Sequence, residues 1–285
     1  MKKIIISLLI TLVLGFSALI SNAQVTISAK DFAALQKSNP GLIVIDATPA
    51  ASYAKMHIIE AVNIPYADLN KTGDIVGLIK DPKEVASILG KQGISTESEI
   101  VVYDDGTNKY SSRVYWVLKY VGAKNVKILH KDMDQWKIAR LRMTKEATAF
   151  KPATFTANIN NVIFASMAEV KAGINNANVV LIDCRDDSEY SGSAEASKGH
   201  LPGAFHIEYK EALTANGDFK SKEALAELAK KFNLTDDKTI ILYCATSVRA
   251  AVSYVAFKDI LGLKNVKVYD GAYNEWVADT SNKVE

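Results

Sequence analysis

Short apolar runs alternate along this chain with segments whose apolar residues recur at helical spacing. The runs are rich in Val, Ile and Leu, as buried parallel strands are, and they cover 41–46, 100–103, 125–129 and 239–243. The segments with helical spacing cover 26–35, 81–89 and 113–121. Strands that alternate with helices predict an α/β fold, in which helices cover both faces of a parallel sheet.

The same order of elements occurs twice. Many positions recur at an offset of 140 residues, among them Ile100 and Ile240, Gly122 and Gly262, Asn125 and Asn265, and Trp136 and Trp276. We therefore expect two homologous α/β domains, over residues 24–140 and 159–285. The segment between them, 141–158, lacks an apolar period and contains Pro152, which predicts a linker.

Residues 1–23 have the pattern of an export signal. Two lysines precede an apolar run over 4–20, and the small residues Ser21 and Ala23 precede a cleavage position at Gln24. We expect a cleaved signal peptide and an exported, periplasmic protein without membrane attachment. An uncleaved membrane anchor is the alternative, because the apolar run is slightly long for a signal core. No other stretch is long and apolar enough to span a membrane.

Composition narrows the possible functions. The chain has 285 residues, 48% of them apolar, and its formal charge of +2 is accounted for by the two lysines of the signal segment. This balance does not favour a nucleic-acid or anionic-membrane partner. The two cysteines, Cys184 and Cys244, are too few for a disulfide scaffold. They have no ligand-spaced partners, so we expect no metal and no other cofactor. In an oxidising compartment the pair could form a disulfide.

Cys244 ends an apolar strand pattern, and a helical pattern begins a few residues later, near Arg249. A thiol at such a strand–loop–helix junction lies close to backbone N–H groups and to the positive end of a helix dipole. Both favour the thiolate, so we expect a lowered thiol pKa. At the 140-residue offset the first repeat has Asp104, and Arg113 follows it by nine residues, whereas Arg249 follows Cys244 by five. Only the second domain can therefore perform thiol chemistry, and Asp104 is expected to be a structural replacement.

Further motifs flank these positions. In the second domain they are Asp183-Cys-Arg185, Glu189-Tyr-Ser-Gly192, Gly199-His-Leu-Pro-Gly-Ala204, Asn216-Gly-Asp-Phe-Lys-Ser221 and Tyr243-Cys-Ala-Thr-Ser-Val-Arg-Ala250. The first domain has a degraded copy, His57 to Pro65. With these motifs in this order, and duplicated, the chain resembles the tandem two-domain form of the rhodanese (sulfurtransferase) family over residues 25–276.

The resemblance implies a sulfur relay. The Cys244 thiolate would attack the outer sulfur of a small donor, become a persulfide, and pass the sulfur to cyanide or a thiol, without a general base. Arg249 and Arg185 would bind the anionic end of the donor. The backbone amides of the loop would hold the persulfide, and they belong to Ala245, Thr246, Ser247 and Val248.

The loop sequence separates possible substrates. The Cys-x4-Arg spacing is shorter than the Cys-x5-Arg loop of related phosphatases, which need a wider ring of N–H groups for phosphate, so sulfur is favoured. We expect thiosulfate as the donor, with 3-mercaptopyruvate as the alternative. Ser247 stands where both enzyme types prefer glycine, and glycine permits unusual φ angles. A non-catalytic persulfide carrier and a thiol-redox protein that uses Cys184 stay open. The oligomeric state does not follow from the sequence.

Several other residues have structural and functional interpretations. Asp183 is expected to order nearby loop amides, and His200, like its counterpart His57, to be structural and not catalytic. Arg185 is either the substrate anchor already named or part of a salt bridge. Cys184 is expected to pack beside the strand end.

Overall fold

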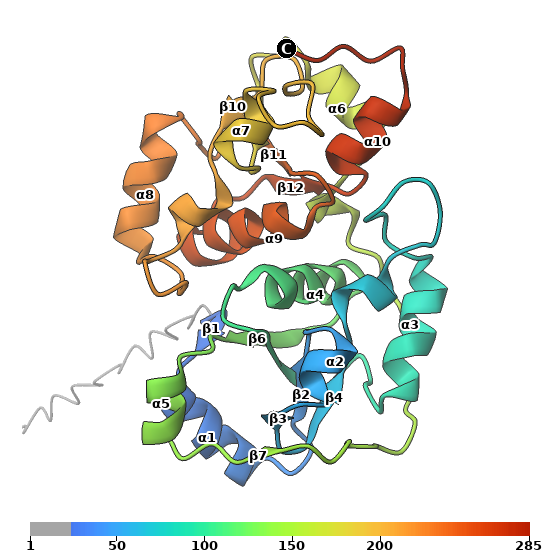
Figure 1. The fold of residues 1–285 in the computed structure, drawn as a ribbon, viewed down its shortest axis with the longest axis vertical. Coiled ribbons are helices and arrows are strands. Elements are labelled where there is room, and N and C mark those ends of the chain that lie inside the picture. The colour runs from blue at the N-terminus through green and yellow to red at the C-terminus, as the bar shows by residue number, and fades with distance from the viewer. Residues whose placement is uncertain (1–23) are drawn as a thin grey trace, which may run out of the picture.

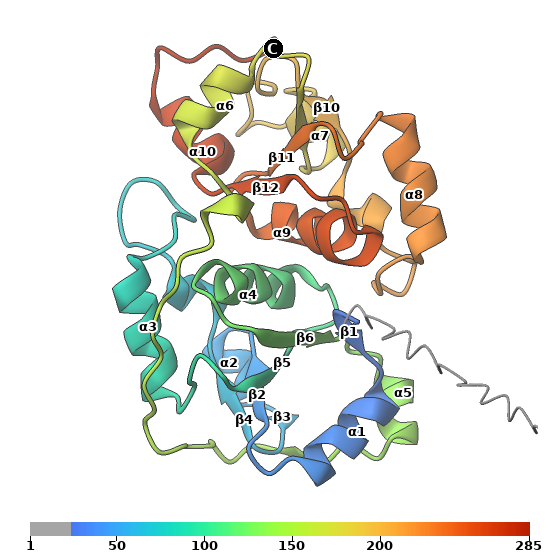
Figure 2. The same ribbon diagram turned by 180° about the vertical axis from the view of Figure 1, so that it is seen from behind.

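A computed structural model describes residues 24–285. The predicted signal segment, 1–23, lies outside the described residues. Two α/β domains are stacked along the long axis, the first blue to green and the second yellow to red in Figures 1 and 2. Each domain has a five-stranded parallel sheet with helices on both faces, which confirms the predicted fold class.

The first domain's sheet has the strand order β1-β6-β5-β2-β4. Its strands are β1 (Thr26–Ile27), β2 (Ile43–Asp46), β4 (Ala61–Asn63), β5 (Glu99–Tyr103) and β6 (Asn125–Leu129). Its helices are α1 (Ala29–Ser38), α2 (Ala50–Tyr53), η1 (Tyr66–Leu69), α3 (Pro82–Lys91), α4 (Lys109–Tyr120) and α5 (Met133–Ile138). A separate antiparallel pair joins β3 (His57–Ile58) to β7 (Met143–Thr144).

The second domain's sheet has the order β8-β12-β11-β9-β10. Its strands are β8 (Phe164–Ala165), β9 (Val179–Asp183), β10 (Phe205–His206), β11 (Thr239–Tyr243) and β12 (Val266–Tyr269). Its helices are η2 (Asn161–Ile163), α6 (Met167–Gly173), α7 (Asp187–Tyr190), η3 (Tyr209–Ala212), α8 (Lys222–Lys231), α9 (Val248–Tyr254), η4 (Val255–Leu261) and α10 (Ala272–Ala278). Taken in chain order, the strands occupy the same places in both sheets, which confirms the duplication.

The segment predicted as a linker is hydrogen-bonded to the first domain. It contains β7, and the amide N–H groups of Ala153 and Asn158 donate to the carbonyls of Gly90 and Val121, both at 2.9 Å. The carbonyl oxygen of Ala153 lies only 2.6 Å from where a Cβ on Gly90 would stand. A glycine in α3 therefore lets this connecting segment run directly against the helix.

The loops that follow the two central strands differ in length by one residue. Asn108, four residues after Asp104, precedes α4, whereas Ser247, three residues after Cys244, precedes α9. Both domains nevertheless end this helix at glycines 140 residues apart. The second helix takes up the extra residue as a π-helical stretch, η4. By position the counterpart of Arg249 is therefore Tyr110, and the predicted helix 113–121 begins earlier, at Lys109.

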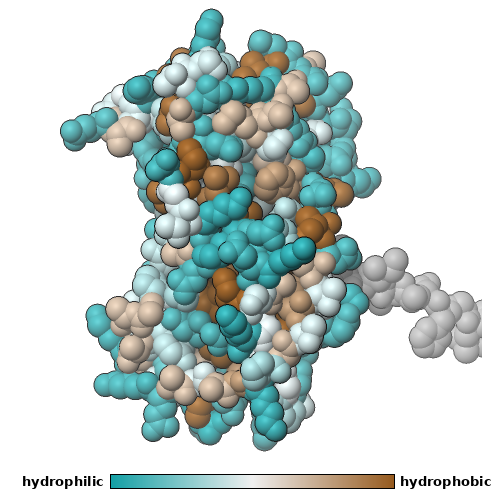
Figure 3. Space-filling model, turned by 90° about the vertical axis from the view of Figure 1, so that its right-hand side faces the viewer, coloured by the Kyte–Doolittle hydropathy of each residue, from teal (hydrophilic) through white to brown (hydrophobic). Residues whose placement is uncertain are grey.

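Helices α4 and α9 lie side by side at the junction of the domains in both views (Figures 1 and 2). Val114 and Val117 of the first domain share one hydrophobic core with Ala251 and Val255 of the second. On the face seen in Figure 3, hydrophobic residues also gather near this junction, among hydrophilic ones. Among residues 24–285, no helix has the length and hydrophobicity that a membrane crossing requires.

Candidate functional site

Cys244 lies at the carboxyl end of the central strand of the second sheet. Its neighbours β9 and β12 flank β11 in parallel, so loops from three strands meet at this edge. Such an edge is where open α/β sheets bind ligands. Cys244 is fully buried, and it is followed by a tight loop that enters α9 at Val248.

Ser247 holds the loop in shape. Its φ angle is 64°, in the left-handed region that favours glycine. Its hydroxyl donates to the carbonyl oxygens of Tyr269, at 2.6 Å, and Asp270, at 2.8 Å. These bonds tie the loop to the end of β12, and they offset the cost of the backbone conformation. They give a physical reason for serine where the resemblance leads one to expect glycine.

In the first domain, the backbone amides of the corresponding loop surround a carboxylate. The Asp104 carboxylate accepts hydrogen bonds from four backbone N–H groups at 2.8–3.2 Å, and they belong to Gly106, Asn108, Tyr110 and Ser111. The Ser111 hydroxyl also donates to it, at 3.1 Å. Burial raises the pKa of Asp104, and the N–H groups partly oppose that shift. The backbone amides of this loop thus surround an acceptor, the carboxylate of the residue that directly follows strand β5.

The second domain has the corresponding loop, shorter by one residue, with a thiol in place of the carboxylate. Within residues 24–285, the six backbone N–H groups of 245–250 have no hydrogen-bond acceptor. Three of them open α9, where the helix dipole favours negative charge. The loop can therefore stabilise negative charge on or next to the Cys244 sulfur.

Arg249 is held by carboxylates of the α7 segment. Its two Nη atoms donate to both carboxylate oxygens of Glu189, one of them at 2.8 Å, and Nη1 also lies 3.1 Å from Asp186. Burial raises the pKa of Glu189, but the hydrogen bond and charge of Arg249 outweigh it and hold that pKa below its usual range. The structure thus gives Arg249 a bidentate ion pair, and 17% of its side chain is exposed.

Arg185 is buried, and its guanidinium is held by groups of the protein. It is 1% exposed and pairs with Asp183 through Nε at 3.0 Å and Nη2 at 2.6 Å, while Nη2 also donates to the carbonyl of Gly199. The guanidinium lies 3.8 Å from the ring centroid of Tyr273. This geometry favours the structural salt bridge over the predicted contact with a substrate anion, because the donors are used internally. Asp183 meanwhile accepts from the Arg185 amide as well as its side chain.

The two histidines have matching surroundings. His200 stacks on Tyr190, with ring centroids 3.9 Å apart, and its Nδ1 lies 3.1 Å from the Tyr190 carbonyl. His57 stacks on Tyr53 at 3.6 Å, and its Nδ1 lies 2.8 Å from the Tyr53 carbonyl. The same arrangement occurs in the domain without a thiol, which supports a structural role.

The first domain contacts the cysteine loop directly, which sequence reasoning missed. Asp270 accepts from Arg113 at 2.7 Å and from the Ile79 amide at 2.9 Å. Arg113 also donates to the Gly77 carbonyl, and a Cβ on Gly77 would lie 2.8 Å from the Thr246 backbone oxygen. Asp270 follows a buried strand, a place where polar site residues gather, but nothing in the sequence pairs it with residues of the other domain.

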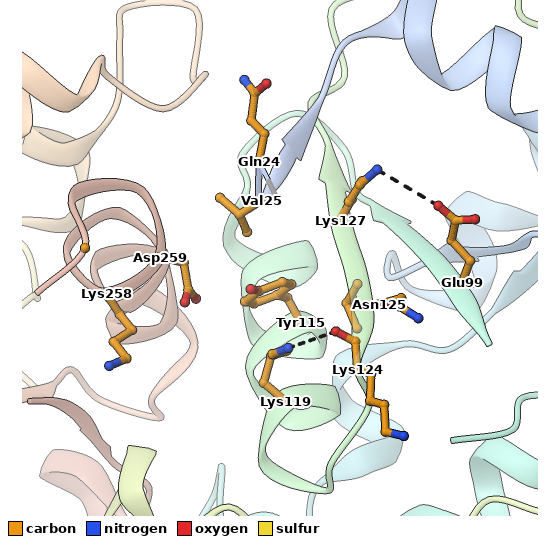
Figure 4. A pocket seen from close by; sticks show the side chains of 12 residues that line it. Gln24, Val25, Glu99, Tyr115, Lys119, Lys124, Asn125, Lys127, Lys258 and Asp259 are labelled. Carbon is orange, nitrogen blue, oxygen red and sulfur yellow. Dashed lines mark hydrogen bonds and ion pairs between the residues drawn. The ribbon is translucent and has the colours of Figure 1, made fainter. Parts of the chain in front are cut away.

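A cavity of about 480 Å³ lies elsewhere along the domain junction. In Figure 4, Asp259 of η4 points toward Tyr115 of α4, with Lys119 and Lys258 nearby. Lys258 and Asp259 lie in η4, which continues α9 and is therefore separated by that helix from the cysteine loop. In the part of the chain that the structure describes, no three His, Cys, Asp or Glu side chains are grouped to hold a metal ion.

Both domains match the same family of known proteins. The family model described as the rhodanese-like domain matches residues 28–139 and 166–279. The thiosulfate sulfurtransferase of Corynebacterium glutamicum is 30% identical over 256 residues, which cover 84% of this chain and 83% of the relative. The sulfur carrier protein TtuD of Thermus thermophilus is 28% identical over 212 residues, covering 68% and 73%. A crystal structure of Escherichia coli SseA, described as a 3-mercaptopyruvate sulfotransferase, aligns with a TM-score of 0.79 and 26% identity, covering 88% and 99%.

Proposed function

The chain belongs to the rhodanese family of sulfurtransferases, and from that premise we propose that it moves the outer sulfur of thiosulfate to cyanide or a thiol through a persulfide on Cys244. The comparison of the two loops carries the proposal. Where the first loop surrounds the Asp104 carboxylate with N–H groups, the second offers its amides to a thiol. A persulfide anion on Cys244 has the acceptor character that such a loop stabilises.

The reaction has two steps. The Cys244 thiolate attacks the outer sulfur of thiosulfate, the sulfur–sulfur bond of the donor breaks, and sulfite leaves with the electron pair. Cyanide then attacks the terminal sulfur of the persulfide, which gives thiocyanate and restores the thiolate. The amides of residues 245–250 stabilise the sulfur anion in both steps, whereas Arg249 and Arg185 are paired with carboxylates and hold the surrounding segments.

Thiocyanate formation from thiosulfate and cyanide tests this function. We expect turnover by the wild type, and a mass gain of one sulfur atom on Cys244 after thiosulfate alone. Cys244→Ser should lose both, and Cys184→Ser, which changes the chain's other thiol, should keep both. Equal turnover by wild type and Cys244→Ser would exclude the mechanism. A persulfide without turnover would instead support a sulfur carrier, as the relative TtuD is named.

The likeness to SseA favours 3-mercaptopyruvate as the second candidate donor. The kcat/KM values for the two donors, with cyanide as acceptor, discriminate between them. A larger value for thiosulfate supports the proposal, and an equal or smaller value overturns the choice of donor. Export to the periplasm stays a prediction from residues 1–23.

A further inference from the structure

The second cysteine lies next to the first. Strands β9 and β11 are hydrogen-bonded neighbours, and their last registered pair is Asp183 with Tyr243. The Cys184 amide then donates to the Tyr243 carbonyl at 2.8 Å, which continues the parallel ladder by one step. Cys184 and Cys244 are therefore the next residues on two adjacent strands. Adjacent strands are about 4.8 Å apart, and disulfides join Cα atoms that are roughly 4.4–6.8 Å apart.

The two thiols also project from the same face of the sheet. Side chains alternate along a strand, so Cys184 shares a face with Ile182, and Cys244 with Leu242. Ile182 and Leu242 are a registered pair, and these four residues belong to one hydrophobic core. The residues between them, such as Tyr243, pack into a different core on the other face.

Cys184 has no part in the sulfur transfer proposed above. It is fully buried, and its sulfur lies 3.9 Å from the carbonyl of Ile182, within its own strand. Burial raises the pKa of this thiol, so it stays protonated and does not compete with Cys244 for a sulfur donor. A thiol beside a sulfenic acid can nevertheless condense with it to a disulfide, because the leaving hydroxide takes up the thiol proton.

We propose that Cys184 is a resolving thiol, which forms a reversible disulfide with Cys244 after a peroxide has oxidised Cys244. The Cys244 thiolate attacks a peroxide oxygen, the O–O bond breaks, and a sulfenic acid forms while hydroxide or an alkoxide leaves and takes up a proton from the solvent. The Cys184 sulfur then attacks the Cys244 sulfur. The S–O bond breaks, the leaving hydroxide takes the Cys184 proton as water, and the disulfide forms. A dithiol reductant later restores both thiols.

The disulfide would protect the site from irreversible loss. A sulfenic acid that meets no thiol is oxidised further, to sulfinic acid, which dithiols do not reduce. A disulfide blocks Cys244 only until it is reduced. The chain contains two cysteines in total. Hence a monomer that loses two hydrogen atoms and both titratable thiols must carry this bond.

The test treats wild type, Cys184→Ser and Cys184→Ala with hydrogen peroxide, alkylates free thiols in denaturant, and measures intact masses before and after dithiothreitol. The wild-type monomer should lose two hydrogen atoms, resist alkylation, and regain both thiols with the reductant. Both variants should gain two oxygen atoms on Cys244 and stay modified. Serine keeps the side-chain volume and alanine keeps the site apolar, so either variant that folds suffices.

Two results would overturn the proposal. One is a wild type that accumulates the sulfinic acid as the variants do. The other is a wild type whose two thiols both remain alkylatable at a peroxide concentration that oxidises Cys244 in Cys184→Ser. These readouts are masses and thiol counts, so they stand whether or not thiosulfate proves to be the donor.

Discussion

The ion pair between Arg113 and Asp270 should be the strongest single link between the two domains. Both side chains are buried, with exposed fractions of 0% and 2%, and their charged atoms are 2.7 Å apart. Asp270→Ala removes the counter-charge of a buried guanidinium and the acceptor of the Ile79 amide. It also weakens the anchorage of the Gly77 segment, which packs on the cysteine loop.

The expected loss of stability follows from this geometry. Removing one partner of a buried ion pair costs about 3–5 kcal/mol, because the other charge is left uncompensated. Arg113→Met should cost a similar amount, since it leaves the Asp270 carboxylate buried. In the double variant neither charge remains. We therefore expect a double-mutant coupling energy of about 2–3 kcal/mol, at the upper end for residues in contact.

Urea unfolding, followed by circular dichroism, measures these free energies for the wild type, both single variants and the double variant. Asp270→Asn is the matched control, because it keeps an acceptor for the Ile79 amide but removes the charge. A loss of less than about 1 kcal/mol in either single variant, or two losses that simply add, would contradict this expectation. In that case the pair would behave like an exposed salt bridge, and the first domain would not hold the cysteine loop through it.

Three further predictions concern single positions. Ser247→Ala should destabilise the fold and slow sulfur transfer more than Ser247→Gly, by about 1 kcal/mol in unfolding free energy, because both lose the hydroxyl but only alanine keeps the left-handed strain. Gly77→Ala should cost about 1–3 kcal/mol and reduce transfer, since its Cβ would meet the cysteine loop at 2.8 Å, whereas Gly73→Ala, with nothing within 4 Å, should be neutral. Burial raises the pKa of Asp259 to about 6, so the folded state binds a proton more tightly than the unfolded state does. Stability should therefore fall by on the order of 2 kcal/mol as the pH rises from about 4 to about 6, and Asp259→Asn should remove that fall in urea titrations.

The duplication and the sheet were predictable because they depend on local patterns. The run 125–129 is β6 in the structure, and the repeated spacing around Gly122 and Gly262 marks the same helix end in both domains. The start of α4 was not predictable. The longer loop after Asp104 begins its helix at Lys109, because the carboxylate gathers amides up to Ser111.

The roles of the arginines needed the structure. The sequence offers Arg185 and Arg249 as anion-binding groups, since a guanidinium suits a sulfonate or a carboxylate equally well. Whether its partner is a substrate or a protein carboxylate depends on residues brought near by folding. Here Asp183 and Glu189 take that place, whereas the amides of the cysteine loop have no acceptor among residues 24–285.

A tandem α/β chain with one thiol at a strand–loop–helix junction can be deduced from the sequence, because strand, helix and turn preferences act over a few neighbouring residues. Which groups surround that thiol depends on how the chain folds in three dimensions. Sheet register brought Cys184 beside it, and domain packing brought Gly77 and Asp270 to its loop. Contacts between distant residues depend on how whole elements pack, and a single chain's pattern does not encode them position by position.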